Sequence, residues 1–241
     1  MSLHILARST AWAVVAKPAG LPVHRSKMVN VRDTVMRAIR HQLPEQAAPV
    51  HRLDRPTSGC LLISLDPAAT PRLQAALAAG DKRYLAFVRG FREDPAEVRV
   101  DRPMKDAQGV LRDAITLIRP VGTSRDPRCS LFLARPLTGR FHQVRRHCRD
   151  LDHPVLGDSK HGDTKVNRWW RDEHALPRLG LHCLSLHLEP EGLEPIRVSC
   201  PVPLDLLAVF ERMPWFEAAC AEVPEMRPSV PPAPGHGTND P

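Results

Sequence analysis

The chain has 241 residues and a formal net charge of +7, with 34 basic against 27 acidic side chains. This length suffices for one domain with a substantial core, and the basic excess favours a polyanionic partner, most often nucleic acid, over a merely soluble basic protein. The six cysteines lack the close pairs of a zinc or redox site. Because no stretch resembles a signal peptide or a membrane span, we expect a cytoplasmic protein without a membrane partner. A monomer is expected.

The N-terminal segment predicts a strand pair followed by a helix. Short apolar runs at residues 3–7 and 12–16 are typical of two strands. Apolar positions at helical spacing then predict a helix over residues 31–43, with Asn30 as a candidate cap.

Between these elements lies a loop fixed by two prolines and a glycine, residues 17–26. Its cationic side chains can face phosphate groups. They are Lys17, His24, Arg25 and Lys27.

The most informative stretch is residues 51–59, HRLDRPTSG, which precedes an apolar run at 60–65 that predicts a strand. Its chemical centre is Asp54, an acid beside the basic residues Arg52 and Arg55. A lone Asp near Pro and Gly most often hydrogen-bonds the backbone of its own turn. The alternative is a catalytic carboxylate held on a rigid element.

A helix over residues 67–79, ended by Gly80, and a strand over 82–90 are expected next. This strand carries Tyr84, the single tyrosine of the chain. Its ring either packs in the core, which the spacing alone favours, or lines a cleft where a base stacks.

Further strands are predicted at residues 97–100, 114–118 and 130–134, followed by the densest cationic stretch at 136–149. If a helix begins after Gly139, its apolar stripe consists of Phe141, Val144 and Cys148, and Arg145 flanks this stripe and can reach inward.

The last third predicts a loop at residues 151–163, a strand pair at 181–188 and 196–199, and a helix at 204–213. The acids and histidines of the loop invite a metal interpretation, which we reject because Lys160 stands among them without a compact ligand set. For Trp169 and Trp170, stacking on nucleic acid and ordinary packing remain equally open. From residue 222 onward, proline and polar residues predict a disordered tail, with residues 1–221 forming the folded domain.

Taken together, five ordered blocks resemble one family, the RluA-type pseudouridine synthases. The blocks are residues 17–24, 51–59, 82–90, 138–147 and 153–163. The resemblance implies an α+β fold, a mixed and largely antiparallel bent sheet flanked by helices, with the active cleft across its middle. It implies a catalytic domain over 1–221 without an S4-like RNA-binding domain, and no metal or cofactor.

The same resemblance implies roles for individual residues. Asp54 matches the essential aspartate, Tyr84 the tyrosine that stacks near the target base, Arg145 the arginine that pairs with the aspartate, and Arg52 an arginine that holds the site once the uridine is flipped. Substrate-binding residues are further expected in the cationic loops: Lys17, His24, Arg140, His142 and Gln143.

The implied reaction breaks the N1–C1′ bond of uridine, turns the uracil and forms a C5–C1′ bond, without redox change. A carboxylate can attack C1′, steady an oxocarbenium-like centre or remove the 2′ proton, and the sequence leaves these routes open. Within the family the chain most resembles the branch that modifies uridine 65 of tRNA, so tRNA is favoured over rRNA. A non-catalytic RNA-binding module and a nucleoside hydrolase are the alternatives.

Overall fold

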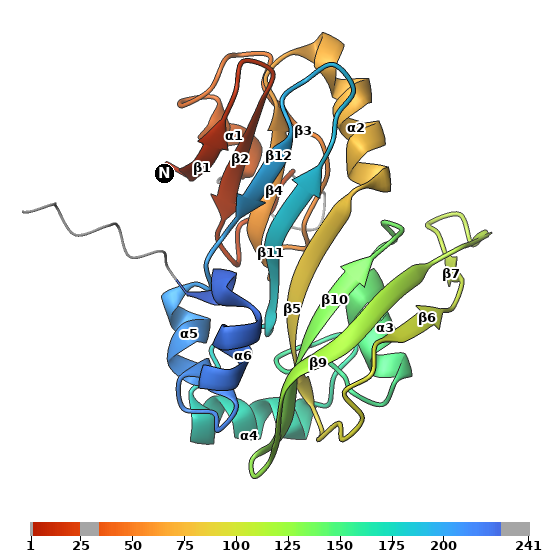
Figure 1. Cartoon of the computed structure of the whole chain (residues 1–241), viewed down its shortest axis with the longest axis vertical. Helices are drawn as coiled ribbons and strands as arrows, with labels where there is room; N and C mark the ends of the chain where they lie inside the picture. Colours follow the sequence, from red (N-terminus) through yellow and green to blue (C-terminus); the bar gives the residue numbers. More distant parts are fainter. Residues whose placement is uncertain (1, 25–33, 228–241) are drawn as a thin grey trace, which may run out of the picture.

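A ten-stranded mixed sheet runs through the molecule in the computed structural model, which describes residues 2–24 and 34–227 (Figure 1). The strand order is β1-β2-β4-β11-β5-β10-β9-β6, with β12 paired to β11 and β3 paired to β4. The strands are β1 His4–Arg8, β2 Trp12–Lys17, β3 Ala48–Pro49, β4 Ser58–Ser64, β5 Asp81–Arg89, β6 Val98–Asp101, β9 Ile115–Arg125, β10 Arg128–Pro136, β11 Leu181–Leu188 and β12 Ile196–Ser199. A separate short hairpin joins β7 Met104–Lys105 and β8 Leu111–Arg112.

The N-terminal half follows the expected pattern. β1 and β2 form the predicted antiparallel hairpin, and β2 pairs with β4, whose residues are all buried. A strand buried on both faces reads as a continuous apolar run, as residues 60–63 do. The 3-10 turn η1 Pro67–Ala69 and helix α2 Thr70–Ala79 follow, and α2 ends at Gly80 as predicted.

Helix α1 Val35–Ile39 is shorter than the predicted 31–43 helix. It begins after Thr34, whose hydroxyl accepts a hydrogen bond from the Arg37 amide, and this bond satisfies an otherwise unpaired donor of the first turn. The expected cap Asn30 lies outside the described residues.

The two halves of the sheet meet where β4 runs parallel to β11, with Ser58 opposite His182 and Gly59 opposite Cys183. Gly59 has φ +117°, and a Cβ there would lie 2.1 Å from the Cys183 carbonyl oxygen, so only glycine permits this approach. The Ser58 hydroxyl and His182 Nδ1 are 2.9 Å apart across the junction. This contact places the loop before β4 beside strand β5, which pairs with the other edge of β11.

Helices cover both faces of the sheet in the C-terminal half. Successive side chains of β5 point to opposite faces, so the strand contacts helices on both sides. Phe87 packs edge-on against Trp170, Phe210 and Trp215, with ring centroids 5.0, 5.3 and 6.0 Å away. These rings belong to α4 Thr164–His174, α5 Leu204–Phe210 and the segment before α6 Phe216–Glu222, which gather at the lower end of Figure 1. On the other face, Ala86 and Val88 pack with α3 Gln143–Asp150.

The folded part extends beyond the predicted boundary at residue 221. Val223 and Met226 are buried, the latter within the 3-10 turn η2 Pro224–Met226, and the Met226 carbonyl accepts a hydrogen bond from the Val202 amide. Hydrophobic spacing was too sparse here to outweigh the prolines in the prediction. Residues 228–241 of the expected tail lie outside the described part.

Among the helices of the described chain, none has the length and apolarity needed to cross a bilayer.

Candidate active site

A cavity of about 680 Å³ opens where the central junction meets α3. Its walls come from the loop at 50–57, the end of α2, strand β5 and residues 136–145. The residues expected to carry the chemistry, Asp54, Tyr84 and Arg145, all line it, as does Arg52. Segments far apart in sequence are thus brought to one cleft.

The carboxylate of Asp54 does not bond the backbone of its own turn. The turn is closed instead by a bond from the Thr57 amide to the Asp54 carbonyl, 3.0 Å. Carboxylate Oδ2 accepts a hydrogen bond from Arg145 Nη1 at 2.9 Å and lies 3.6 Å from His142 Nε2. Within residues 2–24 and 34–227 no hydrogen bond reaches Oδ1, and the side chain is 16% exposed. One oxygen is therefore anchored and the other is available to a ligand.

Arg145 is itself fixed by a second acid that the sequence did not single out. Its Nε and Nη2 each donate to one oxygen of Asp158 at 2.7 Å, a bidentate pair with side chains only 4% and 0% exposed. Asp158 Oδ1 also accepts the amides of Lys160 and His161. Burial opposes both charges, yet these hydrogen bonds raise the pKa of Arg145 and lower the pKa of Asp158.

Tyr84 is half-buried on β5, opposite Ala134 of β10 and Cys183 of β11, and its ring reaches the cleft. It also packs against the apolar core, so the ring both lines the cleft and contacts the core, and base stacking stays a prediction. Burial, assisted by the neighbouring Cys183 and the charge of Asp54, raises the pKa of Tyr84 well above its usual value. The hydroxyl therefore keeps its proton at neutral pH.

Phe141 and His142 precede α3 instead of forming part of it. The helix begins at Gln143, and its cap residue His142 adopts a left-handed φ of +57°. The predicted inward stripe is therefore correct for Val144 and Cys148 but wrong for Phe141, which is 55% exposed. The His142 ring stacks under Phe141 at 3.7 Å and its Nδ1 lies 2.9 Å from His161 Nε2. Burial lowers the pKa of His142 to about 4, so the ring is neutral at pH 7.

Two residues expected to touch substrate are instead committed inside the protein. Lys17 is 1% exposed, and its Nζ donates to the carbonyls of Pro18, Arg55 and Thr57 at 2.9, 3.2 and 2.7 Å. Burial lowers the pKa of Lys17 to about 7. The sequence shows that this residue is charged. It does not show that the side chain points inward at the end of β2.

Gln143 is also buried, although it borders the cleft. Its amide nitrogen donates to the Ile115 carbonyl and the Thr116 hydroxyl, both at 2.9 Å. Its amide oxygen accepts from Thr138 and from the Arg140 backbone at 2.7 and 2.9 Å. With these bonds Gln143 shapes the loop that carries Arg140 and Phe141.

The remaining cationic candidates divide by position. Arg140 is exposed at the cleft, where its Nε donates to the Asp113 carbonyl. His24 is exposed but does not line the cleft, and Arg25 and Lys27 lie outside the described residues.

The sequence missed Asp158, His161 and the exposed position of Phe141. The acids of the loop at 151–163, for which a metal interpretation was rejected, include Asp158, which binds Arg145. No group of three or more His, Cys, Asp or Glu side chains in the described ranges is arranged to hold a metal ion. The sequence signal for a buried, hydrogen-bonded acid was a Gly-Asp pair at a turn, because an aspartate in a turn can accept hydrogen bonds from the backbone amides that follow it. Trp170 is buried, while Trp169 is 46% exposed on α4 and does not line the cleft.

Comparisons with known proteins agree with this geometry. Residues 11–150 match the family model for RNA pseudouridylate synthase. A Vibrio vulnificus protein named tRNA pseudouridine synthase C is 35% identical over 236 residues, covering 88% of this chain and 96% of the relative. A Salmonella typhimurium protein of the same name is 38% identical over 207 residues, covering 77% and 80%.

Among solved structures, human RNA pseudouridylate synthase domain containing 1 superposes with a TM-score of 0.68 at 25% identity, covering 90% of this chain and 87% of the human one. The second human protein, domain containing 4, shares the fold with a TM-score of 0.67 at 21% identity, covering 95% and 94%. These similarities confirm the resemblance seen in the sequence blocks and the predicted mixed, helix-flanked sheet, and the chain belongs to the RluA-type RNA pseudouridylate synthase family.

Proposed function

We propose that this pseudouridine synthase acts on tRNA, with uridine 65 as its target and Asp54 as the catalytic carboxylate. The observation that carries the proposal is Asp54 itself, bordering a large cleft with one oxygen bonded to Arg145 and the other free of hydrogen bonds from the described residues. The relatives named tRNA pseudouridine synthase C support tRNA as the substrate class. The choice of uridine 65 rests on the sequence resemblance.

The cleft suits a nucleotide that has left its stack. A base paired within a helix cannot turn about its own bond, so the uridine must first be extruded. A volume of about 680 Å³ lies within the usual range for sites that enclose a small ligand. A nucleotide and part of its neighbours can therefore enter beside Asp54.

Asp54 is the group that acts on the sugar. Arg145 holds Oδ2 and stabilises the negative charge, which leaves Oδ1 to approach C1′ or the 2′ proton. The guanidinium cannot rotate away because two of its nitrogens are bonded to Asp158. Any of the three chemical routes thus starts from a carboxylate of fixed direction.

We expect Tyr84 to contact the detached uracil. Its ring borders the cleft and offers a face for stacking while the base turns. Its hydroxyl, protonated at neutral pH because of burial, can relay the C5 proton after the new C–C bond forms. The hydroxyl gives up its own proton as it accepts the one from C5, so the C5 hydrogen passes to water while N1 of the uracil gains a proton from the solvent.

The direct test uses purified protein and unmodified tRNA carrying tritium at C5 of uridine, without added metal, with mapping of the modified nucleotide. We expect tritium release that maps to position 65. Release from rRNA alone would overturn the tRNA assignment but retain the chemistry. Free uracil would indicate hydrolysis, and binding without release would indicate a non-catalytic RNA-binding module.

A further inference from the structure

Phe141 presents an aromatic ring at the cleft where the sequence placed a core residue. The residue is 55% exposed and lines the same cavity as Asp54 and Tyr84. Large apolar side chains exposed at a binding cleft mark a contact surface. Besides the Tyr84 ring, which we assign to the target uracil, Phe141 is a second aromatic ring that lines the cleft.

The ring is held rigidly from one side. The imidazole of His142 stacks beneath it with centroids 3.7 Å apart and planes tilted by 22°. That imidazole is only 7% exposed and is fixed by His161 at 2.9 Å. The left-handed backbone of His142, rare for a residue with a Cβ, brings the two adjacent rings into this stack. Because one face is covered, the exposure of Phe141 belongs to its outer face and edge.

The ring also contacts a cation. Cζ of Arg52 lies 5.7 Å from the centroid of the Phe141 ring. Arg52 is exposed. Within the described residues, its guanidinium contacts the Phe141 ring. A weakly held arginine beside a rigid aromatic face is the combination by which proteins bind single-stranded nucleic acid, the ring stacking on a base and the cation meeting the backbone.

We infer that Phe141 is a stacking platform for a nucleobase that adjoins the extruded uridine, and that Arg52 moves from the ring to the RNA when this base arrives. The inference rests on the proposed function, in that RNA occupies the cleft. It adds a second nucleotide to the substrate contacts and gives the site a means of selecting flanking sequence, because purines stack more extensively than pyrimidines. The competing explanation is that Phe141 merely packs Arg52 and His142 in place.

The test is a double-mutant cycle between protein and RNA. The dissociation constant is measured for an unmodified tRNA transcript and for two transcripts that lack the base directly 5′ or 3′ of the target uridine. We expect Phe141→Ala to weaken binding of the complete RNA about tenfold. For one of the two abasic transcripts the same substitution should have almost no effect, because the stacking partner is already absent. Phe141→Tyr should restore tight binding and Phe141→Leu should not.

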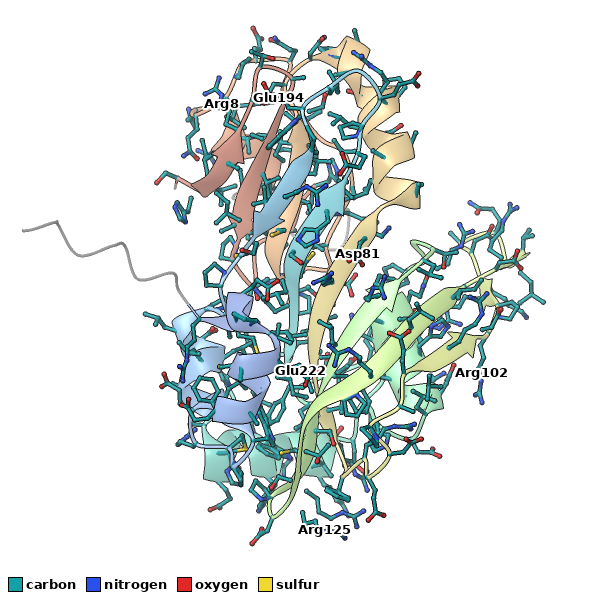
Figure 2. The ribbon with its side chains drawn as sticks, in the orientation of Figure 1. Arg8, Asp81, Arg102, Arg125, Glu194 and Glu222 are labelled. Atoms are coloured by element: carbon teal, nitrogen blue, oxygen red, sulfur yellow. The ribbon has the colours of Figure 1, made fainter. Side chains whose placement is uncertain are left out.

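Phe91 provides a matched control. It too carries an arginine over its ring, with Cζ of Arg125 at 4.2 Å, but it does not line the cleft. Figure 2 shows Arg125 at the lower end of the molecule, far from Asp81 at the start of β5. Phe91→Ala should leave all three dissociation constants unchanged.

Equal losses for Phe141→Ala on all three RNAs, or binding by Phe141→Leu as tight as that of the wild type, would overturn the inference and leave a packing role. Turnover by the wild-type enzyme is followed in parallel. Because the inference is tested in ratios of dissociation constants, a failure of turnover would overturn the proposed function separately.

Discussion

At the scale of single residues, the site depends on a chain of support that runs from Asp158 through Arg145 to Asp54. The bidentate contact belongs to the Asp158–Arg145 pair, and Asp54 receives a single bond. The sequence resemblance implied a pair between Arg145 and Asp54 and gave no sign of a second acid that binds the same guanidinium. The acid that orients the arginine is therefore distinct from the acid that we propose acts on the substrate.

Replacing Asp158 with Asn should lower kcat by about tenfold to a hundredfold with KM changed little, because a misdirected Arg145 no longer fixes Asp54. Breaking a buried pair also costs about 3 kcal/mol in the free energy of unfolding. Steady-state kinetics and denaturant titration measure both. Asp101→Asn, which breaks the exposed pair with Arg99, is the control and should change neither. A wild-type kcat in Asp158→Asn would show that Arg145 needs no such support.

His51 makes the fold sensitive to acid. Burial, with repulsion from Lys82, lowers the pKa of His51 to about 4, and its Nε2 accepts the Leu62 amide at 3.1 Å, which requires an unprotonated nitrogen. Because the folded pKa lies below the unfolded value of about 6.5, the unfolded chain binds more protons between these values. The free energy of unfolding should thus fall as pH drops from 6.5 to 4, by up to about 3 kcal/mol from this residue.

Denaturant unfolding of the wild type and of His51→Gln at several pH values between 7 and 4 measures this term. The glutamine retains an acceptor for Leu62 but does not titrate in this range, so its stability should decline less with acid. His142, whose pKa is also lowered to about 4, accounts for part of the decline that remains. Identical slopes for the two proteins would contradict the assignment.

The sequence was enough to select Asp54, Tyr84 and Arg145, which the structure brings to one cleft, while their catalytic roles stay predictions. What the sequence could not supply was direction. Lys17 and Gln143 looked like ligands for RNA because of their polarity, yet each turns inward to satisfy carbonyl or hydroxyl groups. Side-chain direction at a strand or helix end is set by tertiary packing, which composition does not encode.

At the scale of elements, two loops are joined through Lys17. Its ammonium binds carbonyls on both sides, those of Pro18 and of Arg55 and Thr57 in the loop that carries Asp54. The Gly20 amide adds a bond to the Arg55 carbonyl, and Arg55 Nε returns one to the Gly20 carbonyl. The loop at 17–24 is therefore a brace for the catalytic loop.

Lys17→Met keeps the length of the side chain but removes every donor. Leaving buried carbonyls unpaired should reduce the free energy of unfolding by about 3 kcal/mol, and a looser Asp54 loop should reduce kcat. Lys105→Met, at an exposed strand position, is the stability control and should cost less than about 0.5 kcal/mol. Unchanged stability of Lys17→Met would show that the brace contributes nothing.

Strands were predictable where a continuous apolar run marked them, as in β1, β2 and β4, and α2 was predictable with its end at Gly80. The errors lie at boundaries. β9 ends at Arg125 and β10 begins at Arg128, so both strands are longer than the predicted 114–118 and 130–134 and meet in a tight hairpin. Cross-strand pairing carries polar residues into these strands. The start of α3 was placed too early because hydrophobic spacing could not show that Phe141 belongs to the cleft.

At the scale of the whole molecule, the net charge of +7 predicts that electrostatic attraction contributes to the free energy of RNA binding. Each phosphate contact releases counterions, so the dissociation constant for unmodified tRNA should rise at least tenfold between about 50 and 200 mM salt. Filter binding or fluorescence anisotropy at several salt concentrations measures the slope. A dissociation constant independent of salt would mean that the basic surface does not meet the phosphates.

The fold class followed from the sequence blocks, but the position of the cleft depends on contacts that no local pattern reveals. The parallel approach of β4 to β11 at Gly59 brings the Asp54 loop to Tyr84, and α3 then delivers Arg145 from a segment 91 residues further along. These are long-range contacts, and their geometry becomes visible only in the folded chain.

The central claim is that Asp54 performs the chemistry and does not merely complete the binding site. Its most direct test is single-turnover conversion of C5-tritiated RNA by Asp54→Asn, with RNA affinity and the unfolding transition measured on the same preparation. The amide keeps the size of the side chain and can still accept from Arg145, so we expect near wild-type folding and RNA binding, and tritium release lowered by at least about a thousandfold. Release at the wild-type rate would contradict the account, because another group would then have to act on the sugar.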